Sequence, residues 1–190
     1  MRRLYAVTLP AALGASLALG PSTVLADRSF TGFAKPFTAT ETTASGETAV
    51  IAGQGAMTRA KGAGHSGYVL SDLKNSKAYL VFDSWKAYYE AQRDADQGGD
   101  MEARLDPCRE QKKIAKEAPG VTCTKAGTVM LNGRKADKYV TRMQGSDEAL
   151  TTYFDPQLRL VVKQDGGEED FEMKNIKVGS APGPFALPAG

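Results

Sequence analysis

Two cysteines, Cys108 and Cys123, are the residues whose chemistry depends most on their surroundings. A pair of thiols can bind a metal ion, act as a redox couple or form a structural disulfide. A zinc site needs four ligands, and the single histidine, His65, lies far away in sequence. A redox couple is more often spaced as Cys-x-x-Cys. In an exported protein the pair would therefore form a disulfide worth about 3 kcal/mol, with free or regulatory thiols as the alternative.

The glycine-rich stretch GAGHSG, residues 62–67, satisfies the pattern G-x-G-x-x-G that brings a backbone close to a pyrophosphate. That mechanism needs a strand before the loop and a helix after it, whereas MTRAK and GYVLSD on either side are both typical of strands. His65 and Ser66 suggest a base and a nucleophile, but neighbouring residues on a strand face opposite sides. We therefore expect a loop between two strands here and no Ser-His site.

Acidic residues cluster at Glu168-Glu169-Asp170 and at Asp94 and Asp96, within hydrophilic stretches. Paired carboxylates can perform acid-base catalysis, but charge runs in such turns are usually solvated surface. The sequence contains no assembled catalytic, cofactor-binding or metal-binding set. It therefore predicts a protein that is not an enzyme and that needs no cofactor.

The first residues, MRRLYAVTLPAALGASLALGPSTVLA, have the layout of a secretory signal peptide. Two arginines precede an apolar run, and small residues lead to Ala26. The apolar run is shorter than the roughly 20 residues that cross a bilayer. We expect a signal peptide at residues 1–26 that is cleaved after Ala26, a periplasmic or secreted mature protein, and no integral membrane segment after cleavage.

Composition limits the partners of the mature chain. Removal of Arg2 and Arg3 would reduce the 24 basic residues to the number of acidic residues, 22, and leave a net charge of zero. Proteins that bind nucleic acid normally carry a basic excess, so we expect no nucleic-acid partner. The length of residues 27–190 suits a single domain with its own core.

Most of the mature chain alternates with the period of two that a half-buried sheet requires. Asn132-Gly133 predicts a tight hairpin turn, and Asp155-Pro156 predicts a second turn. Near the end of the chain, Phe171 and Met173 have the opposite phase to Ile176 and Val178, so we expect a bulge after Met173. Strands in the first half should form a meander; they are expected at 36–43, 46–54, 56–61, 67–72 and 77–83.

Few segments favour helix. Asp106-Pro107 is typical of a helix start and Pro119-Gly120 of a stop. The stretch SWKAYYEAQRDADQ, residues 84–97, is compatible with a helix or with a strand that runs into a loop, and residues 92–104 should form an exposed loop. The aromatic residues Trp85, Tyr88 and Tyr89 could belong to a core or line an apolar ligand site.

Three stretches resemble a bacterial exported family of uncharacterised domains that is related to the LolA-like lipoprotein carriers. They are FEMKNIKVGSAPGPFALPAG, TCTKAGTVMLNGRKADKY and GYVLSDLKNSKAYLVFDSWKAYYE. The resemblance implies a mainly β (α+β) fold: a curved antiparallel sheet, or incomplete β-barrel of LolA type, with one or two short helices. The family pattern has a basic residue near Leu70 and Ser71, and this chain has none there.

Characterised relatives of this family bind acyl chains, lipoproteins or partner proteins in the concave face. The resemblance therefore implies a non-enzymatic exported binding or carrier protein for an acyl chain, a lipoprotein or another apolar ligand. The alternative is a protein-protein interaction module, an envelope sensor or scaffold, with the same fold. Candidate residues for an apolar lining are Trp85, Tyr88, Tyr89, Phe154, Leu158 and Leu160.

Overall fold

Strands form where apolar and polar side chains alternate along the chain. The computed structural model describes residues 32–91, 104–108, 120–167 and 170–189. Their only helical element is a single 3₁₀ turn, η1 (Asp83–Trp85), and their eleven strands belong to one antiparallel sheet. The strands are β1 (Phe37–Thr43), β2 (Thr48–Gln54), β3 (Met57–Gly62), β4 (Tyr68–Asp72), β5 (Lys77–Phe82), β6 (Ala87–Ala91), β7 (Val121–Leu131), β8 (Arg134–Met143), β9 (Ala149–Asp155), β10 (Leu160–Asp165) and β11 (Phe171–Val178).

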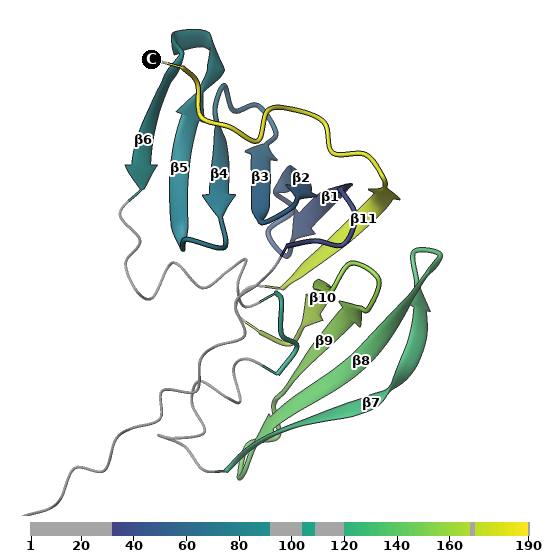
Figure 1. Ribbon diagram of the computed structural model, residues 1–190. Coiled ribbons are helices and arrows are strands. Elements are labelled where there is room, and N and C mark those ends of the chain that lie inside the picture. Colours follow the sequence, from purple (N-terminus) through teal and green to yellow (C-terminus); the bar gives the residue numbers. More distant parts are fainter. Residues whose placement is uncertain (1–31, 92–103, 109–119, 168–169, 190) are drawn as a thin grey trace, which may run out of the picture.

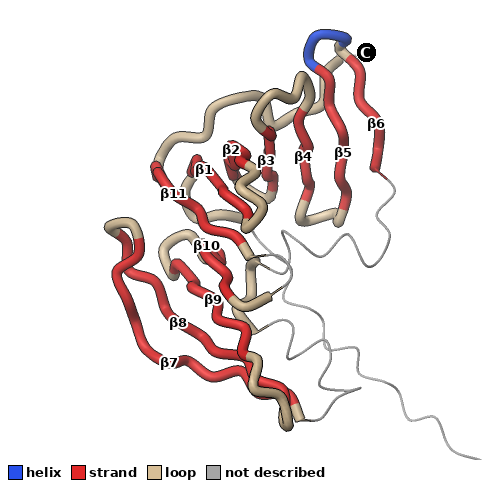
Figure 2. The backbone as a smooth tube through the Cα atoms, turned by 180° about the vertical axis from the view of Figure 1, so that it is seen from behind, coloured by secondary structure: helices blue, strands red, loops and turns tan. Residues whose placement is uncertain are grey.

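Two meanders make up the sheet. Strands β1 to β6 pair in sequence order, as do β7 to β11, and the first strand of the chain pairs with the last, so that Thr42 lies opposite Glu172. The strand order is therefore β6-β5-β4-β3-β2-β1-β11-β10-β9-β8-β7, with β6 and β7 at the two edges. Figures 1 and 2 show the sheet bending sharply around β1 and β11. The predicted curved, open antiparallel sheet is confirmed.

The expected bulge and hairpin turn are both present. Between Thr38 and Thr40 of β1, the pairing with β11 skips one residue, and Asn175 in that stretch has a positive φ of 53°. This bulge reverses the phase of β11, as the sequence predicts. At the β7–β8 turn, Asn132 and Gly133 both have positive φ, 49° and 77°, as a tight primed hairpin turn requires.

The main core lies on one face of the sheet, which we call the inner face. It carries Phe37, Ala39 and Ile51, and the opposite, outer face carries Tyr68 and Leu70. The buried core cluster consists of Phe33, Phe37, Ala39, Ile51, Leu73, Leu158, Leu160, Val161, Val162, Phe171 and Met173. Because β1 and β11 contribute to it from both ends of the chain, this cluster joins the two meanders.

A short segment, Arg104–Cys108, packs against the inner face. Arg104 forms a buried ion pair with Glu41 of β1, and its guanidinium carbon lies 3.9 Å from the centre of the Phe171 ring. The sequence predicted an exposed loop over residues 92–104. This is wrong for Arg104, which the ion pair and the Phe171 ring bury so that it is 7% exposed, and residues 92–103 lie outside the described part of the chain. The backbone oxygen of Arg104 also accepts a hydrogen bond from Val161 at 2.6 Å.

The disulfide between Cys108 and Cys123 holds the other end of this segment on β7. The carbonyl oxygen of Pro107 accepts a hydrogen bond from the Thr152 hydroxyl at 3.2 Å, and the Asp106 carboxylate accepts one from the Cys108 backbone at 3.0 Å. The helix expected from Asp106 to Pro119 lies mostly outside the described residues. Through the segment Arg104–Cys108, the Arg104–Glu41 ion pair and the disulfide together connect β1 with edge strand β7.

For residues 84–97 the sequence allowed a helix or a strand. Residues 84 and 85 complete the η1 turn, and residues 87–91 form strand β6. Lys86 between them has a positive φ of 47°, which turns the chain back along β5. Phe82 then lies opposite Ala87 in the β5–β6 pair. The strand alternative is therefore correct for residues 87–91, and residues 92–97 lie outside the described part of the chain.

Candidate functional site

An apolar row crosses the inner face from the core to the free edge of the sheet. Ile51 lies opposite Ala60, Ala60 opposite Val69, Val69 opposite Leu80 and Leu80 opposite Tyr89. Directly opposed residues in antiparallel strands share a face, so these side chains form one continuous line. Ile51 is buried in the core, whereas Val69, Leu80 and Tyr89 are 41%, 40% and 63% exposed.

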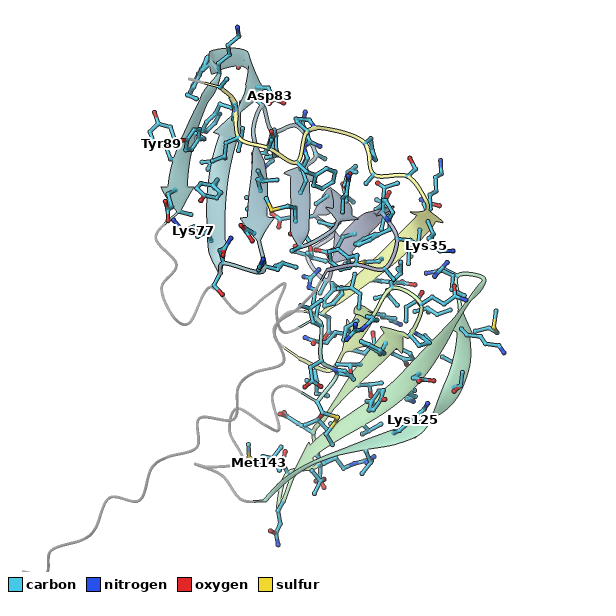
Figure 3. The ribbon with its side chains drawn as sticks, in the orientation of Figure 1. Lys35, Lys77, Asp83, Tyr89, Lys125 and Met143 are labelled. Carbon is cyan, nitrogen blue, oxygen red and sulfur yellow. A yellow bond between two sulfur atoms is a disulfide. The ribbon has the colours of Figure 1, made fainter. Side chains whose placement is uncertain are left out.

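An aromatic cluster extends this row at the β5–β6 turn. Phe82 and Trp85 are three residues apart across the 3₁₀ turn, where side chains eclipse, and their rings stack with centroids 5.0 Å apart. Tyr89 meets Phe82 edge to face at 6.3 Å, and Trp85 is 70% exposed. Figure 3 shows Tyr89 at the free edge of the sheet. We define the apolar patch as Val69, Leu80, Phe82, Trp85 and Tyr89.

Charge is segregated between the two faces of β4, β5 and β6. Their charged residues are Asp72, Lys77 and Glu90, and the strand registers place all three on the outer face. Lys77 and Glu90 form an ion pair there at 3.1 Å, and this hydrogen bond raises the pKa of Lys77. The inner face of these three strands is therefore uncharged and, apart from Ser71, apolar, which is typical of an interaction surface.

The structure separates the six residues that the sequence grouped as a lining. Trp85 and Tyr89 belong to the apolar patch, while Tyr88 lies on the outer face, where its ring meets Tyr79 at 5.9 Å. Trp85, Tyr88 and Tyr89 are all exposed, so the alternative that they form a core is wrong. The remaining three lie in or against the main core on other strands and turns: Phe154, Leu158 and Leu160.

Sequence analysis did not identify Val69, Leu80 or Phe82 as site residues. A signal for them exists in YVLSD and KAYLVF, where apolar residues occupy both phases of the alternation. A strand with one solvated face would carry polar residues in one of the two phases. Both faces of β4 and β5 must therefore be covered or contact a partner.

A hollow lies at the β7 edge of the sheet, far from the apolar patch in the strand order. It has a volume of about 370 Å³ and is lined by Gly120, Thr122, Arg142, Met143 and Gln144 at the open end of the β7–β8 hairpin. Arg142, Met143 and Gln144 are exposed. None of these five lining residues is a buried titratable group.

Of the residues considered for catalysis, Asp94, Asp96, Glu168 and Glu169 lie outside the described part of the chain. His65 and Ser66 are exposed in the turn between β3 and β4, which joins two strands as the sequence predicts. Within the described ranges, no group of three or more histidine, cysteine or acidic side chains is placed to hold a metal ion. In the same part of the chain, no helix combines the length and apolar character needed to span a bilayer.

Comparisons with models of known protein families and with curated proteins found no match. Solved structures did match. MucB is 16% identical over 85% of this chain and 60% of its own, with a TM-score of 0.50. The MucA/MucB complex of Pseudomonas aeruginosa matches at 17% identity, 83% and 56% coverage and a TM-score of 0.49. An uncharacterized conserved protein from Thermus thermophilus matches at 13% identity, 76% and 78% coverage and a TM-score of 0.42.

The chain shares the fold of MucB. Its matched part spans 60% of the MucB chain, and at 16% identity the likeness concerns the fold alone. The fold class expected from the sequence, a curved antiparallel sheet of LolA type, is thereby confirmed. Activity has to be argued from this chain's own surface.

Proposed function

We propose that this protein is a non-enzymatic exported binding protein whose apolar patch binds a segment of a partner protein. The observation that carries this proposal is the uncharged row of half-exposed apolar side chains that ends in Phe82, Trp85 and Tyr89. Aromatic side chains are enriched where protein partners bind, because they bury a large area with little loss of conformational freedom.

Two further observations support the proposal. The fold is that of MucB, and MucB itself has been seen in complex with MucA. A disulfide between Cys108 and Cys123 suits an oxidising compartment, which agrees with the signal-peptide pattern of residues 1–26 and with a single domain from residue 27 onward. An envelope sensor or scaffold that binds another exported protein fits all of these features.

A carrier for an acyl chain or a lipoprotein is the competing function. Ligand sites usually enclose most of a small apolar ligand. Trp85 and Tyr89 are instead 70% and 63% exposed and form an open surface at a sheet edge. This exposure favours a protein segment, which brings enough area of its own to cover the patch.

Photo-crosslinking in exporting cells tests the proposal. A photoreactive phenylalanine derivative at Tyr89 faces the patch, and the same residue at neighbouring Tyr88 faces the other side and serves as the control. We expect a protein-sized adduct from position 89, none from position 88, and loss of the adduct when Leu80→Asp is added. Equal adducts from both positions, no adduct, or an adduct of lipid mass would contradict the proposal.

A further inference from the structure

The outer face of β3–β5 carries a second apolar cluster, formed by Tyr68, Leu70 and Val81. These side chains are 2%, 0% and 0% exposed, although the main core lies on the other face of the sheet. Phe185 and Leu187 pack against them from the segment after β11. We call residues 180–189 the strap; Figure 1 shows it in yellow, crossing β3, β4 and β5. The cluster is buried because the strap covers it.

Side chains rather than backbone hydrogen bonds hold the strap. Its entry is fixed by Gly179, whose N–H donates to the Pro36 carbonyl at 2.7 Å. Within the described part of the chain, no backbone hydrogen bond of a turn or loop involves residues 180–189. Three of these residues, Pro182, Pro184 and Pro188, lack the N–H that pairing with a strand requires. The strap therefore lies on the sheet like a bound peptide, through Phe185 and Leu187.

One polar group beneath the strap, Arg59 Nε, is left without a hydrogen-bond partner. The Arg59 guanidinium carbon lies 4.0 Å from the centre of the Tyr68 ring, and a Cβ at Gly183 would lie 3.2 Å from the same guanidinium. Arg59 Nε is buried and makes no hydrogen bond within the described residues, whereas the Tyr68 hydroxyl lies close enough to Asp83 for the carboxylate to raise its pKa. Buried donors without acceptors are rare because their lost hydration is not replaced.

The strap does not supply the missing acceptor. Its sequence, SAPGPFALPA, contains no acidic residue that could pair with Arg59. A carboxylate at this point would form a charge-assisted hydrogen bond with Arg59 Nε, a stronger interaction than a neutral one. The strap thus covers the apolar cluster and leaves Arg59 Nε without an acceptor.

We propose that this outer-face cluster, together with Arg59, forms a peptide-binding groove that the strap occupies in cis. Its ligand is an extended segment of another protein, with an aromatic and an aliphatic residue spaced as in Phe185 and Leu187 and a carboxylate that reaches Arg59. Proline-containing extended segments suit such aromatic-lined grooves because they lose little conformational freedom on binding. The groove is distinct from the apolar patch on the inner face, so the protein has two binding surfaces on opposite faces of β4 and β5.

Synthetic peptides and the full chain test this site. The probes are the peptide of residues 179–189 and a series with a single Asp placed in turn at positions 181 to 184. Calorimetry is performed with the wild-type chain and with the double variant Phe185→Ala, Leu187→Ala, whose own strap is weakened. Because the strap competes at high effective concentration, the parent peptide should bind the double variant at least about tenfold more tightly than the wild type.

The acidic peptides test the role of Arg59. We expect at least one Asp position to strengthen binding about tenfold, as a charge-assisted hydrogen bond allows. Arg59→Gln should abolish this gain and leave binding of the parent peptide in place. An acidic series that binds no better than the parent, or a gain that survives in Arg59→Gln, would overturn the carboxylate part of the proposal.

A control peptide with both apolar residues replaced by Ala should bind neither chain. No binding of the parent peptide to a folded double variant, or equal binding of parent and control peptides, overturns the site. Folding is checked by circular dichroism and thermal unfolding; if the double variant does not fold, Leu187→Ala alone takes its place. Crosslinking from Tyr89 on the inner face does not depend on these peptides, so the two proposals can fail separately.

Discussion

At the scale of single residues, two leucines on neighbouring strands differ in their burial. Leu70 is fully buried beneath the strap on the outer face, and Leu80 is 40% exposed on the inner face. Both belong to strands with apolar residues in both phases, so neither residue type nor strand position distinguishes them. The difference comes from what covers each face.

Leu80→Asp should therefore remove binding at the apolar patch with little effect on folding. A charge at the centre of an uncharged surface must be desolvated when a partner binds, whereas in the free protein it stays hydrated. We expect the free energy of unfolding to change by about 1 kcal/mol or less. Leu70→Ala, the matched control, should lower it by about 2–5 kcal/mol, since it opens a cavity in a buried cluster. Denaturant unfolding checks both values.

Tyr68 should titrate at unusually high pH. Burial beneath the strap raises the pKa of its hydroxyl, and the negative charge of Asp83 adds to this effect. The folded protein thus keeps this proton at a pH where the unfolded chain has lost it. Stability from this group is complete below the ordinary pKa of 10.0 and is lost as pH rises from there through the folded pKa.

Ultraviolet titration of tyrosinate checks this expectation by comparing the wild type with Tyr68→Phe. The difference curve should show one phenol that ionises later than the others. The variant should also lose less stability than the wild type between pH 9 and about 11, since its phenyl ring cannot ionise. A difference curve with an ordinary midpoint would show that the hydroxyl is exposed to water in solution.

At the scale of elements, the segment Arg104–Cys108 is fixed on the inner face at both ends. Glu41 and Arg104 are 8% and 7% exposed, and the ion pair brings together residues that are far apart in sequence. The sequence carries no sign of this pairing, because Glu41 alternates with threonines in a strand and Arg104 follows a hydrophilic stretch.

Replacement of Glu41 by Ala should lower the free energy of unfolding by about 3–5 kcal/mol, because it leaves the buried Arg104 charge without its partner. The exposed pair of Lys77 and Glu90 provides the control, and Glu90→Ala should cost about 1 kcal/mol or less. Urea unfolding of the two variants measures the contrast. Similar values for both would mean that water reaches Arg104 in solution.

At the scale of the whole molecule, the pairing of β1 with β11 makes one continuous sheet of the two meanders. β1 pairs with β2 on one side and with β11 on the other, and the main core lies over this junction. Among the described residues, β6 and β7 each pair with a strand on one side only. Strong bending around β1 and β11 separates the two edges in space (Figure 2).

Thr40→Pro should therefore unfold the entire sheet. Thr40 lies between Val50 of β2 and Lys174 of β11, so its N–H points towards a paired strand on either side. Proline removes that hydrogen bond and is tolerated only at sheet edges. Two single variants of edge strand β7, Thr124→Pro and Lys125→Pro, serve as controls. Neighbouring N–H groups on a strand point to opposite sides, so one of these two points away from β8, and proline should be tolerated there. Circular dichroism distinguishes the outcomes.

Much of the local structure followed from the sequence. The period-two alternation predicted most strands, Asn132-Gly133 predicted the hairpin turn, and the phase change between Met173 and Ile176 predicted the bulge at Asn175. These features depend on interactions between near neighbours in sequence, and such interactions are visible in a short window of residues. The aromatic residues Trp85 and Tyr89 were recognised as a candidate site for the same reason.

The tertiary structure alone decided how these pieces meet. The pairing of β1 with β11, the ion pair of Arg104 with Glu41 and the burial of Tyr68 by the strap all join residues distant in sequence. Because strands β4 and β5 are apolar in both phases, the sequence required both of their faces to be covered or to contact a partner. Which face the strap covers, and which remains open for a partner, depends on the path of the chain after β11.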